Sequence, residues 1–492
     1  MENNMLRQKL QILLPLLFAA GGATLICGLV YLHNGQLHWL LYTMLGLWIT
    51  LVLFALTDLR YGFIHLIFYG TIFLFLMSRP TMDWFRTGKL DTYQADAYRF
   101  SFIIVMVSLV CLTIGGQLAK LLMHKRSRQQ SLAVNRPMVA AVDWILILQK
   151  VSFWSFMVTY PFLFIRVAER LLFRLTTTYY NYYASFTSRL PYFTYLLSVV
   201  VFYSLCIYLS TRPAKKWAVL VLGLYIIPDM MYLVIGTRNP FILTGFFILF
   251  YFFVRNQEEI GKWIGCLEKT VLLLATPVLV LLMGILNYVR DGVSAADLNI
   301  PALFADFVYK QGTSFGVLAR GYLYNKDFPF RDFRNYSFGP IIDYFSRGNL
   351  GRLLFDTAPF TTTNNSLEMG IYSNSYAHNL SFVVIRNDYL AGHGLGGSYM
   401  MDLYSDYGWW GVIIGNVVLG MVFVWMLNSL YRHSLIGGII SLMIIKEVFF
   451  YPRSDFASGI MALFTVQFWT VAVLLFAFSY GLARRKTNLQ GI

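Results

Sequence analysis

The stretch GHGLGGSYMMDLYSDYGWWG occupies residues 392–411 and leads into an apolar run centred near residue 419. It combines glycines, two aspartates four residues apart and a pair of tryptophans. Tryptophan and tyrosine are enriched where membrane helices meet water. An apolar run of about 20 residues is long enough to cross a bilayer. The stretch therefore predicts a membrane helix that is preceded by carboxylates and flexible backbone.

The composition extends this prediction to the whole chain. Of its 492 residues, 58% are hydrophobic and only 13% are charged, whereas about 25% of the residues of a soluble domain are charged. The apolar residues fall into runs of membrane-spanning length. We expect an all-α polytopic membrane protein with about 12 transmembrane helices, centred near residues 22, 47, 70, 111, 154, 200, 226, 247, 279, 419, 442 and 471.

The distribution of positive charge predicts the orientation of the chain. Its formal net charge is +15, and the lysines and arginines gather in short loops, such as residues 120–136. Basic loops of this kind are retained in the cytoplasm. An even number of spans then places both termini inside, so we attribute the charge to membrane orientation and expect no nucleic-acid partner.

One loop is much longer than the others. Residues 290–407 lie between the predicted spans 9 and 10, and long loops on rigid scaffolds often carry function. The sequence thus predicts three parts: a transmembrane region at 1–289 with about nine spans, a large external loop at 290–407, and a region at 408–492 with about three spans. The run IPALFADFVY at 300–309 predicts a helix along the membrane surface.

Three arginines stand at the outer ends of predicted spans: Arg238 in VIGTRNPFIL, Arg290 in NYVRDG and Arg453 in FYPRSDF. Pro240 suits the first turn of a helix, whose free N–H groups attract anions. Guanidinium groups match phosphate oxygens in a two-pronged contact. The alternative is that these arginines reach outward to lipid phosphates. No D-x-D pair or H-x-x-x-H spacing occurs, so we expect neither a metal nor another cofactor.

Asp402 and Asp406 lie four residues apart, which places both on one face of a helix. Asp402 is the candidate general base toward a hydroxyl, and Asp406 also suits a helix cap. His378, in SYAHNL, and His393 are competing bases. Anchoring in the interfacial belt is the alternative role for the aromatic residues here, and a hydrogen-bonded loop position is the alternative for His378.

The run AHNLSFVVIRNDYLAGHGLGGSYMMDLYSDYGWWGVIIGN, residues 377–416, resembles the signature of Wzy-type O-antigen and exopolysaccharide polymerases. GTRNPF and FYPRSDF resemble arginine positions of that family. The resemblance covers about the last half of the chain, and the first half is similar only in topology. It implies a fold like that of GT-C membrane glycosyltransferases, with an external active site.

The resemblance also implies an activity. A growing glycan would pass from undecaprenyl diphosphate to the non-reducing end of a new lipid-linked repeat unit, at the outer face of a bacterial inner membrane. Implied partners are the bilayer, a flippase and a chain-length regulator. The site residues that we expect are catalytic Asp402, His378 and Arg290, with substrate contacts from Arg238, Arg453, Gly396, Ser398, Tyr399 and Asp406.

Two other functions stay open from the sequence. A lipid-linked oligosaccharide flippase or another transporter should show internal repeats and charges along a path through the membrane; no repeat is visible, and the charges favour the outer loops. An O-antigen ligase would have a similar donor site, so the sequence does not separate it from a polymerase.

Overall fold

The computed structural model describes residues 2–130, 139–177, 182, 186–258, 263–274, 284, 300–362 and 364–490. Within these residues the protein is entirely helical, as the sequence predicts. The helices form two compact units. Unit 1 comprises residues 1–125, 296–427 and 448–458, and unit 2 comprises residues 126–295, 428–447 and 459–492. The three-part division drawn from the sequence stays a prediction.

Ten helices of the described residues are long and apolar enough to cross a membrane. They are Gln11–Asn34, Leu37–Thr57, Leu59–Thr87, Ala95–Met123, Trp144–Thr176, Tyr192–Ser210, Lys215–Ile235, Asn239–Glu258, Tyr399–Tyr431 and Val466–Lys486. Each matches a predicted span. The span predicted near residue 279 lies outside the described residues, so the count of twelve stays a prediction.

The apolar run near residue 442 forms a shorter helix than we expect. Helix α20 (Leu435–Val448) has 14 residues and is therefore about 21 Å long, less than the roughly 30 Å of a bilayer core. It ends because Pro452 and its neighbours form the tight turn η6 (Tyr451–Arg453), in which Arg453 N–H donates to the Phe450 carbonyl.

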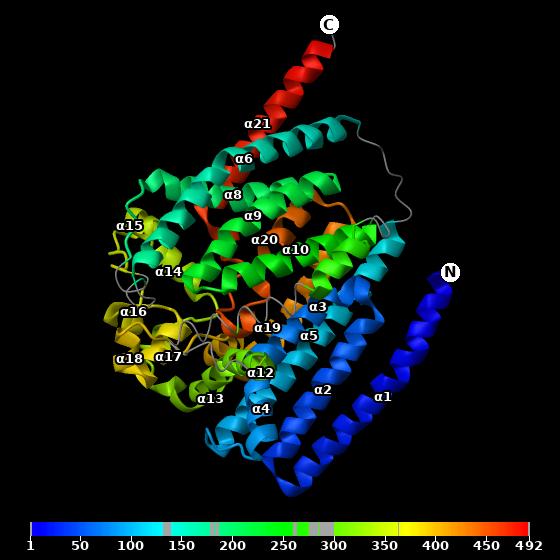
Figure 1. Ribbon diagram of the computed structural model, residues 1–492, viewed down its shortest axis with the longest axis vertical. Helices are drawn as coiled ribbons and strands as arrows, with labels where there is room; N and C mark the ends of the chain where they lie inside the picture. The colour runs from blue at the N-terminus through cyan, green and yellow to red at the C-terminus, as the bar shows by residue number, and fades with distance from the viewer. Residues whose placement is uncertain are drawn as a thin grey trace. The chain divides into compact units, whose positions relative to one another are not determined.

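Unit 1 begins with α1 (Glu2–Asn34) and α2 (Leu37–Thr57), an antiparallel pair drawn in blue in Figure 1. It continues with α3 (Leu59–Ile72), the π-helix η1 (Phe73–Met77), α4 (Ser78–Thr87) and α5 (Ala95–Gln130). Helices α5 and α19 (Tyr399–Tyr431) approach backbone to backbone. A Cβ added to Gly115 would lie 2.0 Å from the Val417 carbonyl oxygen, and one added to Gly420 would lie 2.1 Å from that of Leu112.

The long predicted loop is mostly helical, with helices too short to span a membrane. They are α12 (Ile300–Gln311), η3 (Gly312–Ser314), α13 (Phe315–Tyr324), η4 (Asn325–Asp327), η5 (Arg331–Phe333), α14 (Gly339–Arg347), α15 (Asn349–Phe355), α16 (Leu367–Tyr372), α17 (Tyr376–Val384) and α18 (Arg386–Leu390). The helix predicted at residues 300–309 is present as α12, and its position along the membrane surface stays a prediction. These helices belong to unit 1 together with α3, α5 and α19.

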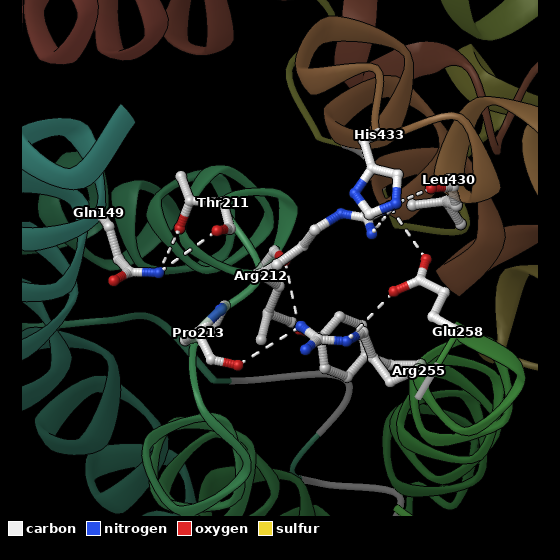
Figure 2. A network of polar contacts seen from close by, with 10 residues as sticks. Gln149, Thr211, Arg212, Pro213, Arg255, Glu258, Leu430 and His433 are labelled. Atoms are coloured by element: carbon white, nitrogen blue, oxygen red, sulfur yellow. Dashed lines mark hydrogen bonds and ion pairs between the residues drawn. The ribbon is translucent and has the colours of Figure 1, made fainter. Parts of the chain in front are cut away.

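Unit 2 contains α6 (Val139–Thr176), α8 (Tyr192–Ser210), α9 (Lys215–Ile235), α10 (Asn239–Glu258), α20, η7 (Met461–Phe464) and α21 (Val466–Gln490). Figure 2 shows a network of polar contacts between several segments of this unit. Arg212, between α8 and α9, pairs with Glu258 at 2.9 Å, and Arg255 pairs with the same carboxylate at 3.3 Å. Arg212 also contacts His433 Nε2 at 3.0 Å, so one arginine joins three segments of the unit.

Candidate active site

The glycine-rich segment before α19 lies against α17. The Leu395 N–H donates to Ser381 Oγ at 3.0 Å, and Ser381 in turn donates to the Ala377 carbonyl. Gly396 has φ +81°, a left-handed conformation that favours glycine. The segment is exposed at residues 392–394 and buried at Gly397 and Ser398, and its glycines allow close approach to the backbone.

Gly408 divides α19 into two helices. Its φ of 62° and ψ of −150° are not helical, and this region of backbone space is essentially restricted to glycine. Asp402 and Asp406 therefore stand on a short helix that precedes the membrane-length segment. The two aspartates share this helix, as predicted, but their carboxylates have different partners.

Asp402 is fully buried, with 0% of its surface exposed. Its Oδ2 accepts a hydrogen bond from the Phe456 N–H at 2.9 Å, and its Oδ1 has no hydrogen-bond partner among the described residues. The carboxylate thus holds the chain that follows η6 in place.

Asp406 performs a similar task for another segment. It accepts hydrogen bonds from the N–H groups of Tyr336 at 3.1 Å and Ser337 at 2.7 Å, and Arg331 lies 3.9 Å away. Asp406 therefore does not cap the helix after Gly408. Its carboxylate instead binds the backbone of the loop that leads into α14.

Asp455 is a functional candidate that the sequence analysis did not select. A Cβ added to Gly397 would lie 3.3 Å from Asp455 Oδ1, so this carboxylate borders the glycine-rich segment. Within the described part of the chain its side-chain oxygens accept no hydrogen bond. Burial, followed by repulsion from Asp343, raises the pKa of Asp455 to about 6. A carboxylate with this pKa can accept a proton near neutral pH.

Asp343 supports this arrangement from α14. It accepts two hydrogen bonds from Asn374, at 2.9 Å from the backbone N–H and at 2.6 Å from Nδ2. Burial raises its pKa, although both hydrogen bonds favour the charged form. Because its oxygens are occupied, Asp343 affects Asp455 through charge.

His378 follows Ala377, whose Cβ is 3.6 Å from a Cβ added to Gly397. Its Nδ1 contacts Tyr389 Oη at 2.8 Å, and that hydroxyl donates to the Ser366 carbonyl at 3.2 Å. The Tyr389 hydroxyl therefore joins the imidazole of His378 to the backbone of Ser366. Burial lowers the pKa of His378, which keeps the ring neutral.

The three predicted arginines lie in different parts of the chain. Arg453 Nη1 donates to Gln311 Oε1 at 3.4 Å, and its guanidinium lies 5.9 Å from the centre of the Phe75 ring. Arg238 belongs to unit 2, in the turn between α9 and α10 that begins with Gly236 at φ 106°. Arg290 lies outside the described residues.

Two of the predicted substrate contacts are in the core of unit 1. Ser398 and Tyr399 are both fully buried, and Tyr399 Oη donates to Asn416 Oδ1 at 2.7 Å. Tyr399 also stacks on Phe456, with ring centres 6.5 Å apart. In this conformation both residues support the segments around Gly396 and Asp455, and their contact with substrate stays a prediction.

The described residues hold no group of three or more His, Cys, Asp or Glu side chains that could bind one metal ion. The expectation of a metal-free reaction stays a prediction. The groups that the structure brings together are the Asp455 carboxylate, Gly397 and the start of α17 at Ala377, the residue before His378.

The candidate spans and a family match together define the chain as a multi-pass membrane glycosyltransferase. The chain is a member of the O-antigen polysaccharide polymerase Wzy family, which it matches over residues 16–486. The resemblance recognised in the sequence is thereby confirmed over nearly the whole chain. No curated protein and no solved structure matches it. The family implies an enzyme that polymerises lipid-linked repeat units.

Proposed function

We propose that this polymerase transfers a growing glycan from undecaprenyl diphosphate to the non-reducing end of a lipid-linked repeat unit at the outer face of the inner membrane. The acceptor hydroxyl oxygen forms a bond to the anomeric carbon, and the bond from that carbon to the diphosphate breaks. The hydroxyl proton needs a base, and the departing diphosphate needs positive charge more than it needs a proton.

Asp455 is the proposed base, and its surroundings are the observation that carries the proposal. Its carboxylate borders Gly397, accepts no hydrogen bond from the described residues, and has a pKa of about 6. It is therefore mostly ionised at neutral pH and retains a free lone pair.

Asp402, the base expected from the sequence, is better suited to positioning. Asp402 is buried and accepts a hydrogen bond from the Phe456 N–H. This bond holds Asp455, the residue before Phe456, against the glycines. His378 is the second candidate base, because burial lowers its pKa and keeps the imidazole neutral.

The diphosphate is assigned to the arginines. Arg453 lies two residues before Asp455 in the chain, and its guanidinium is proposed for the charge of the diphosphate. Contact of Arg238 and Arg290 with substrate phosphate stays a prediction. The basic loops support cytoplasmic termini and an external site, and the flippase and chain-length regulator are proposed partners that deliver repeat units and limit the product.

The test is a reaction of the purified protein in nanodiscs with an undecaprenyl diphosphate-linked repeat unit as sole substrate. We expect a ladder of glycans that differ by one repeat. A single transferred product on a different acceptor lipid would indicate a ligase. Movement of the substrate between leaflets without any new glycosidic bond would indicate a transporter and overturn the proposal.

A further inference from the structure

Two arginines of α4 lie over one tyrosine of α12. The Arg79 and Arg86 guanidinium carbons are 4.9 and 5.4 Å from the centre of the Tyr309 ring. Neither arginine forms an ion pair with an acid among the described residues, and Arg79 Nε is buried without a hydrogen-bond partner. Two positive charges thus lie over one aromatic ring, and the Nε–H of Arg79 is left without an acceptor among the described residues.

The local fold holds this pair in place. The π-helix η1 comes directly before α4, and π-helical turns occur frequently at functional sites. Ser78 Oγ, at the start of α4, lies 3.3 Å from the Val308 carbonyl of α12. A Cβ added to Gly312 would lie 2.6 Å from the Arg79 Cβ. The two helices therefore meet at a contact that requires glycine.

Arg453 adds a third positive charge at the same end of α12. Its partner Gln311 is two residues beyond Tyr309, and the Phe75 ring beneath Arg453 belongs to η1. The C-terminal end of α12 supplies only about half a negative charge. This is less than the combined charge of Arg79 and Arg86, so the helix end alone does not neutralise that pair.

The depth of the arginines suits a lipid phosphate. Helix α3 begins at Leu59, and at 1.5 Å per residue Arg79 lies about 30 Å further along the helix, near the full thickness of a bilayer core. Arg86 lies about 10 Å beyond Arg79. The pair thus reaches the level at which lipid phosphates meet water, where guanidinium groups form two-pronged contacts with phosphate oxygens.

We propose that Arg79, Arg86 and Tyr309 form a lipid-phosphate subsite beside Arg453, which receives phosphate groups of a lipid-linked glycan. The inference rests on the proposed function for the identity of that lipid. Tyr309 separates and orients the guanidinium groups, and the phosphate supplies negative charge opposite Arg79 and Arg86.

The experiment measures binding without transfer. Undecaprenyl diphosphate, which carries no sugar, is titrated into nanodiscs of zwitterionic lipid that hold the wild type, Arg86→Gln, or Arg79→Gln/Arg86→Gln. We expect the double variant to bind at least about tenfold more weakly, because each charge-assisted hydrogen bond contributes about 1.5–3 kcal/mol. Arg86 is exposed, so Arg86→Gln tests the site without risk to folding and should show a smaller loss.

Two further variants separate the subsite from general effects. Tyr309→Phe keeps the ring and should bind like the wild type. Arg99→Gln removes an arginine that already pairs with Asp96 at 3.0 Å, and it should have no effect. Unchanged binding in the double variant would overturn the subsite, whether or not the wild type polymerises.

A second arm distinguishes the source of the phosphate. The same variants are titrated with phosphatidylglycerol in place of undecaprenyl diphosphate. Loss of affinity for undecaprenyl diphosphate alone supports the carrier lipid as ligand. Equal losses of affinity for both lipids would overturn this assignment. The arginines would then bind the phosphate of ordinary lipid headgroups. Failure of the wild type to polymerise would count against the proposed function and leave the binding result intact.

Discussion

At the scale of single residues, the contrast between Asp402 and Asp455 determines how the reaction should respond to mutation. Asp455→Asn preserves shape and removes the base. We expect the rate of polymerisation to fall by about 10²-fold or more, and the wild-type rate to decrease as the pH falls through about 6, where Asp455 becomes protonated. The measurement is ladder formation against pH with saturating substrate.

Asp332→Asn is the matched control for this prediction, because Asp332 is an exposed aspartate of the same unit. It should leave the rate and its pH dependence unchanged. If Asp455→Asn works at the wild-type rate while His378→Gln is inactive, the histidine is the base.

The raised pKa of Asp455 also predicts an effect on stability. The unfolded value is about 3.9 and the folded value about 6, so the folded protein binds more protons between these limits. The free energy of unfolding therefore falls as the pH rises through this window. Asp455→Asn removes this loss and should raise the Tm at about pH 8, with a gain that shrinks toward about pH 4. A uniform shift at both pH values would contradict it.

Asp402 can be tested as a positioning residue by comparing two substitutions. Asp402→Asn keeps an oxygen that accepts from the Phe456 N–H, so we expect a modest loss of rate and an unchanged pH profile. Asp402→Ala leaves that donor unpaired and should cost about 1–3 kcal/mol of stability. A loss of about 10²-fold in Asp402→Asn with intact folding would instead identify Asp402 as the base.

The sequence predicts the helix that Asp402 and Asp406 share, and the structure confirms it. The roles of Asp402 and of Arg453 in FYPRSDF stay predictions, and Asp455 enters as a candidate only through its contacts. The burial of Asp402 and the contact of Asp455 with Gly397 arise from packing between residues 54 and 58 positions apart in the chain. Periodicity along one segment carries no information about such contacts.

At the scale of elements, membrane-length helices were the most predictable feature, because an apolar run of about 20 residues has few other folds available in a bilayer. The break at Gly408 was not predicted, since the hydrophobic pattern continues across it. The run near residue 442 misled for the same reason: its apolar residues extend past Val448, where the helix ends.

Gly408→Ala tests the break in α19. Its φ of 62° with ψ of −150° costs a residue with a Cβ about 1–3 kcal/mol. We expect a lower Tm and loss of activity, because a continuous helix would move Asp402 and Asp406 away from their partners. Gly70→Ala is the control: it lies in α3 with no atom within 4 Å of an added Cβ, so it should be neutral or slightly stabilising.

At the scale of the whole molecule, the chain forms two compact units, and each draws on distant parts of the sequence. Hydrophobicity predicts the membrane helices of both units but not which helices share a core. The long segment was predicted as a loop because its apolar runs are short. Its short helices instead form most of the surroundings of the candidate site, including α12, α14 and α17.

Orientation in the membrane is the last prediction, and the proposed function depends on it. In a background without Cys27, Cys111, Cys206 and Cys266, a cysteine at Ser127 should resist an impermeant maleimide in intact cells, because basic loops stay in the cytoplasm. A cysteine at the exposed Asn364 should react. Both should react after permeabilisation, which controls for burial.

Asn364 is an informative position because its neighbour reports on the candidate site. Asn365 Nδ2 donates to the His393 carbonyl at 2.7 Å and to that of Tyr389 at 2.9 Å, so a label at Asn364 marks the side that holds the glycine-rich segment and the tyrosine that contacts His378. Labelling of Ser127→Cys but not of Asn364→Cys would place these groups in the cytoplasm. Asp455, which borders the same glycines, would then be unable to meet a repeat unit at the outer face.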